Sequence, residues 1–144
     1  MIHEHARIGE KTLIYFPELS NIGECSIGTK SVIHSHVWIA NGVFIGNNVR
    51  IQAFTFIPQG VTIEDDVFIG PRVTFLNDKY PPSGKWSTTL IKRGASIGGG
   101  AVILPGLSIG ENAMVGAGSV VTKHIPDNEV WMGTPAKFFK KKSI

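Results

Sequence analysis

The chain has 144 residues, of which 42% are hydrophobic and 17% charged. This length and balance are typical of one globular domain covering residues 1–144. No apolar run approaches the roughly 20 residues of a membrane-spanning helix, and the first residues lack the pattern of a secretory signal. The single cysteine, Cys25, excludes an internal disulfide. The sequence therefore predicts a cytoplasmic protein with no membrane insertion.

The net charge of +3 has its source in the C-terminal tail. Four lysines and no acidic residue follow Pro135, namely Lys137, Lys140, Lys141 and Lys142. A nucleic-acid-binding protein normally spreads its lysines and arginines over a face, so no nucleic-acid partner is expected. A terminal cluster suits a small anionic ligand or simple solubility.

An isoleucine recurs at every sixth residue along most of the chain. The period begins at Ile2, Ile8 and Ile14, and a register shift at residues 16–21 predicts a bulged corner before Ile22. The main run consists of Ile27, Ile33, Ile39, Ile45, Ile51, Ile57, Ile63 and Ile69, followed by Phe75. Four places after each stands a small or β-branched residue. Because a helix has a period of 3.6 and a strand a period of 2, a period of six indicates a short strand and a turn, repeated.

The frame breaks at residues 76–90 and resumes at Ile91, which predicts one solenoid interrupted by one projecting loop. Three hexads close a coil, so every third inward residue is expected to stack in one column. The three columns would contain Ile27, Ile45 and Ile63; Ile33, Ile51 and Ile69; and Ile39, Ile57 and Phe75. Glycine after the inward residue, together with Asn47, Asn48, Asp65, Asp66 and Asn112, is expected to supply the turns.

The hexads I-G-T-K-S-V, I-G-N-N-V-R, I-G-P-R-V-T and I-G-E-N-A-M resemble the hexapeptide repeat of the left-handed parallel β-helix acyltransferases. The similarity covers nearly the whole chain and implies an all-β, left-handed parallel β-helix with a projecting loop. The left hand rests on the resemblance alone, because the general rule for parallel crossovers gives the right hand. The end of the chain also resembles the family's close. There Thr134 is expected to cap a short C-terminal helix within residues 134–144 that Pro135 begins.

The loop at residues 76–90 concentrates polar and aromatic side chains, and loops on rigid scaffolds commonly carry function. Its run Asn77-Asp78-Lys79-Tyr80-Pro81 resembles the loop of the N-acetyltransferases that act on nucleotide-linked 3-amino sugars. This resemblance implies that Asp78 orients the amine and that Asn77 binds the sugar. The loop lacks the histidine that many O-acetyltransferases of this fold place there, which favours an amine over an alcohol acceptor.

The resemblance further implies a homotrimer that holds acetyl-coenzyme A in a groove between subunits. Gly99 stands one coil before Ala117, and Gly100 one coil before Gly118, so their exposed backbone could accept a thin pantetheine arm. Small residues are also common in turns, which leaves the alternative open. Lys123 and the terminal lysines, Lys137 among them, would meet the coenzyme's phosphates or lie free in solvent.

Four further side chains, His36, Arg72, Arg93 and Trp86, are candidates for the substrate site. His36 faces outward and is a candidate base, and one or two coils later the same stripe carries Phe54 and Arg72 toward an interface or the sugar nucleotide. Arg93 is expected to bind the sugar or its diphosphate. Trp86 is expected to stack on a ring. Each of them could instead make an ordinary contact between subunits.

The implied function is transfer of an acetyl group from acetyl-coenzyme A to the 3-amino group of a dTDP- or UDP-linked deoxyamino sugar. By resemblance, it serves the synthesis of bacterial surface polysaccharide such as lipopolysaccharide. No metal is expected. The spacing of the pairs His3/His5 and His34/His36 does not match the zinc site of a γ-type carbonic anhydrase, and no third ligand is well placed beside them. An O-acetyltransferase and a non-catalytic β-helical scaffold remain as alternatives.

Overall fold

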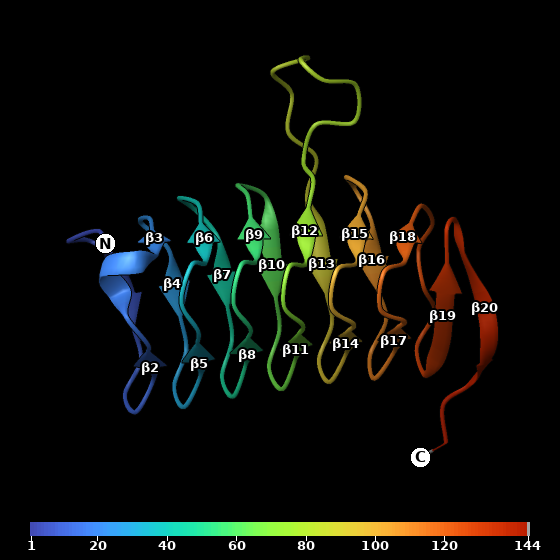
Figure 1. Ribbon diagram of the computed structural model, residues 1–144, viewed down its shortest axis with the longest axis horizontal. Helices are drawn as coiled ribbons and strands as arrows, with labels where there is room; N and C mark the ends of the chain where they lie inside the picture. Colours follow the sequence, from blue (N-terminus) through green and yellow to red (C-terminus); the bar gives the residue numbers. More distant parts are fainter. Residues whose placement is uncertain (144) are drawn as a thin grey trace.

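The computed structural model describes residues 1–143. The chain winds in successive coils as a parallel β-solenoid, and its short strands line up into three sheets (Figure 1). Sheet A contains β3 (Asn21–Ile22), β6 (Trp38–Ile39), β9 (Phe56–Ile57), β12 (Thr74–Phe75), β15 (Val102–Ile103) and β18 (Val120–Val121). Sheet B contains β1 (Arg7–Ile8), β4 (Ser26–Ile27), β7 (Phe44–Ile45), β10 (Val61–Ile63), β13 (Thr89–Ile91) and β16 (Ser108–Ile109). Sheet C contains β2 (Leu13–Ile14), β5 (Val32–Ile33), β8 (Arg50–Ile51), β11 (Phe68–Ile69), β14 (Ser96–Ile97), β17 (Met114–Val115), β19 (Glu129–Gly133) and β20 (Ala136–Lys141). Each coil passes from sheet B to C to A, which confirms the coil expected from the period of six.

The isoleucine columns form the core in the expected register. Ile27 pairs with Ile45 and Ile45 with Ile63 in sheet B, and all three side chains are at most 2% exposed. Burying one such side chain is worth roughly 1.5–3 kcal/mol. Inward hydroxyls are satisfied as well, since Ser31 Oγ donates to the carbonyl oxygen of Gly46 over 3.1 Å. Because each coil packs mainly on its neighbours, stability is spread along the axis.

The glycine that follows the inward isoleucine is required by the closeness of the coils. A Cβ on Gly46 would lie 2.3 Å from Asp65 Oδ1 and 2.9 Å from the Asp65 backbone nitrogen. Gly46 does not have a positive φ, whereas Asn48, Asp66 and Asn112 do. Asn48, Asp66 and Asn112 thus adopt the left-handed conformation expected of turn residues, whereas Gly46 is needed for the close approach of the next coil.

The corner between sheets B and C is held by side chains that reach from coil to coil. The Thr29 backbone N–H donates to Asn47 Oδ1 over 2.8 Å, and the Asn47 N–H donates to Asp65 Oδ1 over 2.7 Å. Near the end of the solenoid, the Glu111 N–H donates to Asp127 Oδ1 over 2.7 Å. An Asn or Asp at this position therefore caps the N–H of the coil before it.

Two irregular segments were expected from breaks in the period. The first contains the short 3-10 helix η1 (Pro17–Leu19), which absorbs the register shift. The second is the projecting loop, which covers residues 76–88 instead of 76–90. Thr89 already belongs to β13, where it pairs with Val61 and is 2% exposed, because its side chain occupies an inward position. Within residues 1–143, no helix combines the length and apolar character needed to cross a bilayer.

The expected C-terminal helix is wrong, because the chain closes with an antiparallel hairpin. Strand β19 continues sheet C by pairing with β17, with Val115 opposite Trp131, and β20 pairs with β19. Thr134 and Pro135 form the turn of this hairpin instead of a helix start. The open edge of sheet C offers unpaired backbone groups, and a strand satisfies them whereas a helix does not. Residue 144 lies outside the described residues.

Glu129 links the two strands of this hairpin, so we expect its stability to depend on pH. The Trp131 indole N–H donates to Glu129 Oε1 and Lys141 Nζ to Oε2, each over 3.0 Å. Both bonds, the indole first, lower the pKa of Glu129 below its usual 4.5. A lowered folded pKa gives stabilisation that is present above pH 4.5 and lost as the pH falls through the folded pKa.

Acidification from pH 7 to pH 3 should therefore lower the melting temperature less in Glu129→Gln than in the unaltered chain. The matched control is Glu10→Gln, which removes the same charge from an exposed turn. Equal acid sensitivity of the two variants would contradict this role for Glu129.

Candidate active site

The corner between sheets C and A, here called the C–A corner, changes character along the solenoid. One column of this corner consists of His36, Phe54, Arg72, Gly100 and Gly118, all with φ between 58° and 73°. Backbone hydrogen bonds join successive coils here, such as the Gly100 N–H to the carbonyl oxygen of Pro71 over 2.8 Å. The expected shared stripe of His36, Phe54 and Arg72 is present, and so is the stacking of Gly100 on Gly118. The column has bulky side chains in its first half and none in its second.

The bulky half is a continuous stack. The rings of His36 and Phe54 lie 4.6 Å apart at 14°, and Arg72 Cζ lies 5.8 Å from the Phe54 centroid. A cation over an aromatic face is attractive, whereas a left-handed backbone costs roughly 1–2 kcal/mol for a non-glycine residue. The stack ends at Arg72, because the next residue in the column is Gly100.

The bare half exposes backbone across two consecutive coils. It consists of Gly98, Gly99 and Gly100 in one coil and Gly116, Ala117 and Gly118 in the next. The N–H groups of Gly99 and Ala117 have no hydrogen-bond acceptor among residues 1–143. At the corner between sheets B and C, an Asn or Asp of the next coil supplies that acceptor. Ala117 occupies the corresponding place above Gly99, so the Gly99 N–H remains available to a ligand.

The loop rises from the corner between sheets A and B (Figure 1). At its base, Asn77 Nδ2 donates to the carbonyl oxygen of Gln59 over 2.9 Å, and the Ser87 N–H donates to the Asn77 carbonyl oxygen over 2.8 Å. The amide nitrogen of Asn77 thus anchors the loop, while its side-chain oxygen accepts no hydrogen bond among residues 1–143. Trp86 is 52% exposed and stands ready to contact a ligand or another subunit.

The Asp78 carboxylate is held by groups of the loop itself. It accepts the Ser83 hydroxyl over 2.5 Å, the Ser83 N–H over 2.7 Å and the Tyr80 N–H over 3.2 Å. These bonds, the Ser83 hydroxyl first, lower the pKa of Asp78 below its usual 3.8. A carboxylate that is ionised throughout the neutral range is a poor proton acceptor, but it can attract an amine and the positive charge that develops on it.

The remaining candidates lie at or near three different corners of the solenoid. Lys137 lies near the bare half of the C–A corner, since it pairs with Met132, whose Cβ lies 2.8 Å from the place of a Cβ on Gly116. Lys123 follows β18 on the loop side of the solenoid. Arg93 lies at the corner between sheets B and C, where its N–H donates to Glu64 Oε1 over 2.9 Å. The structure therefore does not bring Arg93 to the loop, although the two are close in sequence.

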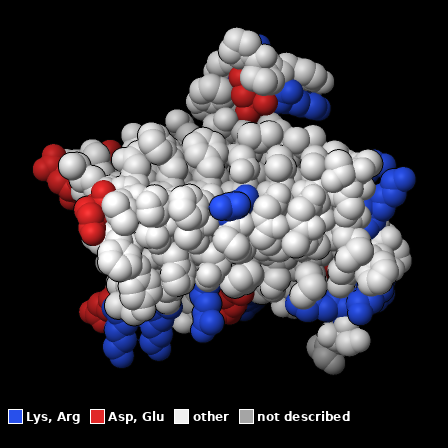
Figure 2. Space-filling view, in the orientation of Figure 1, with Lys and Arg blue, Asp and Glu red and all other residues white. Residues whose placement is uncertain are grey.

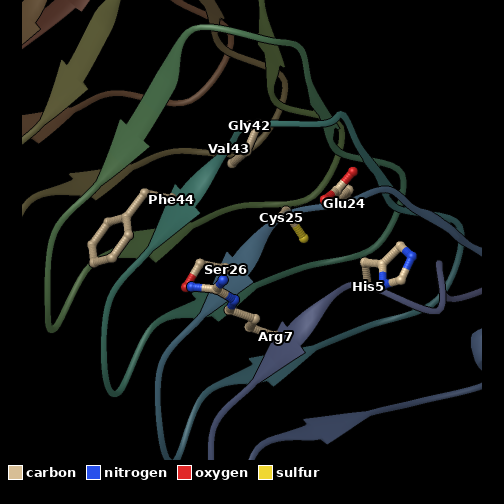
Figure 3. Close-up of a pocket in the computed structure, with 8 residues that line it drawn as sticks. All are labelled: His5, Arg7, Glu24, Cys25, Ser26, Gly42, Val43 and Phe44. Carbon is tan, nitrogen blue, oxygen red and sulfur yellow. The ribbon is translucent and has the colours of Figure 1, made fainter.

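A hollow of about 440 Å³ lies elsewhere, on the outer side of sheet B (Figure 3). Its lining includes His5, Arg7, Cys25 and Phe44. Burial raises the pKa of Cys25 to about 11, so the thiol stays protonated and behaves as a small apolar side chain. Among residues 1–143, no three His, Cys, Asp or Glu side chains gather as a metal site.

The loop and the bare backbone lie at opposite edges of sheet A. The outward residues of this sheet are mainly apolar, and Trp38 and Phe56 are 50% and 39% exposed with their rings 6.5 Å apart. Figure 2 shows a broad face beneath the loop with a single basic side chain near its middle, and with basic and acidic side chains along the bottom of the view. Such a face is typical of a surface that contacts another chain.

The sequence repeat and the coil geometry agree with those of a known protein family. The family described as bacterial transferase hexapeptide (six repeats) matches residues 42–77 and 88–123, which together make half of the chain. The chain belongs to this family. The matched ranges stop at the base of the loop on either side, as expected for an insertion between repeats.

Individual hexapeptide transferases resemble the chain to different extents. A galactoside O-acetyltransferase from Lactococcus lactis is 33% identical over 94% of this chain and 63% of its own length. A dTDP-3-amino-3,6-dideoxy-alpha-D-galactopyranose 3-N-acetyltransferase from Aneurinibacillus thermoaerophilus is 59% identical over 34% of this chain and 26% of its own length. The chain thus spans less than two thirds of these curated relatives.

The solved structure of a variant of AntD, an N-acyltransferase from Bacillus cereus, has the same fold. It contains dTDP and coenzyme A, and it superposes with a TM-score of 0.79 at 24% identity, over 95% of this chain and 84% of that one.

Sequence reasoning missed two features of the site. The free N–H of Gly99 had a signal, because Ala117 stands where the other corner has Asn47 and Asp65. The hydrogen bond between Ser83 and Asp78 had no such sequence signal, because a loop sequence does not indicate which residues on its two sides come into contact.

Proposed function

We propose that this chain is an acetyl-coenzyme A-dependent N-acetyltransferase acting on the 3-amino group of a dTDP- or UDP-linked deoxyamino sugar. The bare backbone at the C–A corner carries the proposal. Two coils with only glycine and alanine at this corner leave room for a thin pantetheine arm along the axis, and the free N–H groups of Gly99 and Ala117 can bind its carbonyl oxygens. Lys137 is near enough to the same strip to attract coenzyme phosphate. AntD, which shares the fold, holds coenzyme A and dTDP.

The site requires more than one copy of the chain, and we propose a homotrimer. Asp78 stands on the loop at one edge of sheet A, and the proposed coenzyme groove runs along the other edge. A ring of copies in which the loop edge of one meets the C–A corner of the next would unite the two halves. It would also cover Trp38 and Phe56.

The reaction follows from these groups. The unprotonated sugar nitrogen attacks the thioester carbon, the carbon–sulfur bond breaks, and the proton lost by the nitrogen passes through a proton acceptor to the departing coenzyme sulfur, which leaves as the thiol. The Gly99 N–H would stabilise the oxyanion. The Asp78 carboxylate would accept a hydrogen bond from the attacking amine and stabilise the positive charge that develops on the amine nitrogen. His36 is the proposed proton acceptor, with Asn77, Trp86 and Arg72 contacting the sugar nucleotide.

Two wider proposals accompany this function. The proposed nucleotide-linked substrate supports action in the cytoplasm, on precursors of surface polysaccharide such as lipopolysaccharide. Lys123, on the loop side of the solenoid, is proposed to meet coenzyme phosphate from a neighbouring subunit.

The test is thiol release from acetyl-coenzyme A with a panel of acceptors. The panel contains dTDP-3-amino, dTDP-4-amino and UDP-3-amino sugars, free glucosamine, a galactoside and serine. Turnover confined to a nucleotide-linked 3-amino sugar is the expected result. Turnover of the galactoside or serine alone would overturn the proposal in favour of an O-acetyltransferase, and coenzyme binding without turnover of any acceptor would also contradict it.

Asp78→Asn should lower kcat/KM for the amino sugar by about 10²-fold, because an amide attracts a developing positive charge far less than a carboxylate does. KM for acetyl-coenzyme A and the melting temperature should change little, since Asp78 lies on the exposed loop. The matched control is Asp66→Asn at the corner between sheets B and C, where Asn48 already holds the same conformation one coil earlier. Equal activity of the two variants would remove Asp78 from the mechanism.

A further inference from the structure

Ser83 stands at the centre of the loop's hydrogen bonds. Its hydroxyl donates to Asp78 Oδ1 over 2.5 Å and accepts the Lys85 N–H over 3.1 Å. Its own N–H donates to Asp78 Oδ2 over 2.7 Å. One residue thus contacts both oxygens of the carboxylate and also the returning side of the loop.

Little else orders this part of the loop. The bonds at the base of the loop hold Asn77 and Ser87, whereas Tyr80 and Trp86 are 75% and 52% exposed. Besides Ser83, the Asp78 side chain is held by the Tyr80 N–H over 3.2 Å and, more weakly, by the Gly84 backbone. The direction in which the Asp78 carboxylate points therefore depends chiefly on Ser83.

We propose that Ser83 is a positioning residue, whose hydroxyl holds the Asp78 carboxylate so that its remaining lone pairs face the amine of the acceptor. This inference rests on the proposed function of Asp78. A carboxylate offers about four acceptor positions. The three hydrogen bonds to Ser83 and Tyr80 occupy three of them, and the Gly84 backbone makes the weakest contribution to the lowered pKa, so one position can still accept from the amine. The chemistry requires a hydroxyl, because the same atom donates to Asp78 and accepts from Lys85, which alanine cannot do.

The experiment compares Ser83→Ala, Ser83→Thr and Ser87→Ala. Threonine restores the hydroxyl at an exposed site, and Ser87→Ala removes a hydroxyl that makes no hydrogen bond in the described chain. The Asp78 carboxyl is titrated by carbon-13 NMR in each protein, with Asp78→Asn identifying its signal. KM and kcat are measured for the amino sugar and for acetyl-coenzyme A.

In Ser83→Ala, we expect the titration midpoint of Asp78 to move up toward 3.8 and kcat/KM for the amino sugar to fall by about 10-fold or more, as for a lost bond to a charged group. KM for acetyl-coenzyme A should stay unchanged. Ser83→Thr should regain most of the loss, and Ser87→Ala should match the unaltered chain.

The two readouts separate the inference from the function on which it rests. An unmoved Asp78 midpoint in Ser83→Ala, or a loss in Ser83→Thr as large as in Ser83→Ala, would overturn the role of Ser83 even in an active enzyme. A chain that acetylates no amino sugar would overturn the proposed function, and the midpoint would then show that the Ser83 contact is structural only.

Discussion

Ala117→Asn should reduce kcat/KM for acetyl-coenzyme A by about 10²-fold while leaving the fold intact. In the unaltered chain, the Gly99 N–H has no acceptor among residues 1–143. An asparagine at position 117 would supply one, as Asn47 does for Thr29 at the corner between sheets B and C. An N–H that is already bonded cannot bind the thioester oxygen, and loss of one such donor typically costs 10²–10³ in rate.

The backbone is suited to this substitution. Asn47 lies between Gly46 and a left-handed Asn48, and Ala117 lies between Gly116 and a left-handed Gly118. An asparagine side chain can therefore adopt at position 117 the conformation that it already has at position 47. The melting temperature should stay equal or rise, because the new bond satisfies a backbone group.

Two control variants isolate the hydrogen bond. Ala117→Gly removes the methyl group and leaves the Gly99 N–H free, so its coenzyme kinetics should match those of the unaltered chain. Thr29→Asn introduces the same side chain at the equivalent place of the other corner. Coenzyme kinetics in Ala117→Asn equal to those of both controls, measured by thiol release and by calorimetric binding of coenzyme A, would show that the coenzyme lies elsewhere.

Ile51→Asp should leave no folded protein. Ile51 is 0% exposed and lies in register between Ile33 and Ile69 in sheet C. An unpaired carboxylate in that column has no partner and no water, which costs many times the 1.5–3 kcal/mol that the isoleucine contributes. The defect also divides the solenoid near its middle, and a few coils alone cannot bury a continuous core.

Circular dichroism and urea unfolding measure this effect, and the graded variants make it quantitative. Ile51→Val should cost about 0.5–1.5 kcal/mol and Ile51→Ala about 2–5 kcal/mol. The control is Arg50→Asp, which places the same charge on the neighbouring exposed position of β8 and should change stability by about 0.5 kcal/mol or less. A folded Ile51→Asp protein would mean that this column is not the core.

The repeat was readable because each hexad repeats the same local problem. An inward isoleucine, a close glycine and a left-handed turn residue must recur wherever a coil lies on a coil, so the period alone predicted three columns, the loop position and the register shift. The role of the glycine after the inward isoleucine differed from the expected one, which was to form the turn. Gly46 is needed because Asp65 of the next coil comes within 2.3 Å of the place of its Cβ, and closeness between coils has no local signature.

The prediction of a C-terminal helix was wrong for a related reason. Thr134 and Pro135 suit the start of a helix when read alone. The edge of sheet C left by β17, however, offers Met114 and Val115 as pairing partners, and β19 takes them. Tertiary pairing outweighed local preference, because an unpaired sheet edge leaves several backbone groups unsatisfied.

The sequence by itself determined the solenoid, the position of its loop and the stripe of His36, Phe54 and Arg72, because all of these follow from a period that local residues maintain. Only the tertiary structure decided that Arg93 lies away from the loop, that Ser83 holds Asp78, and that the Gly99 N–H is free. Each of these depends on which backbone or side-chain atoms of another segment come within hydrogen-bonding distance, and that distance is a property of the folded coils.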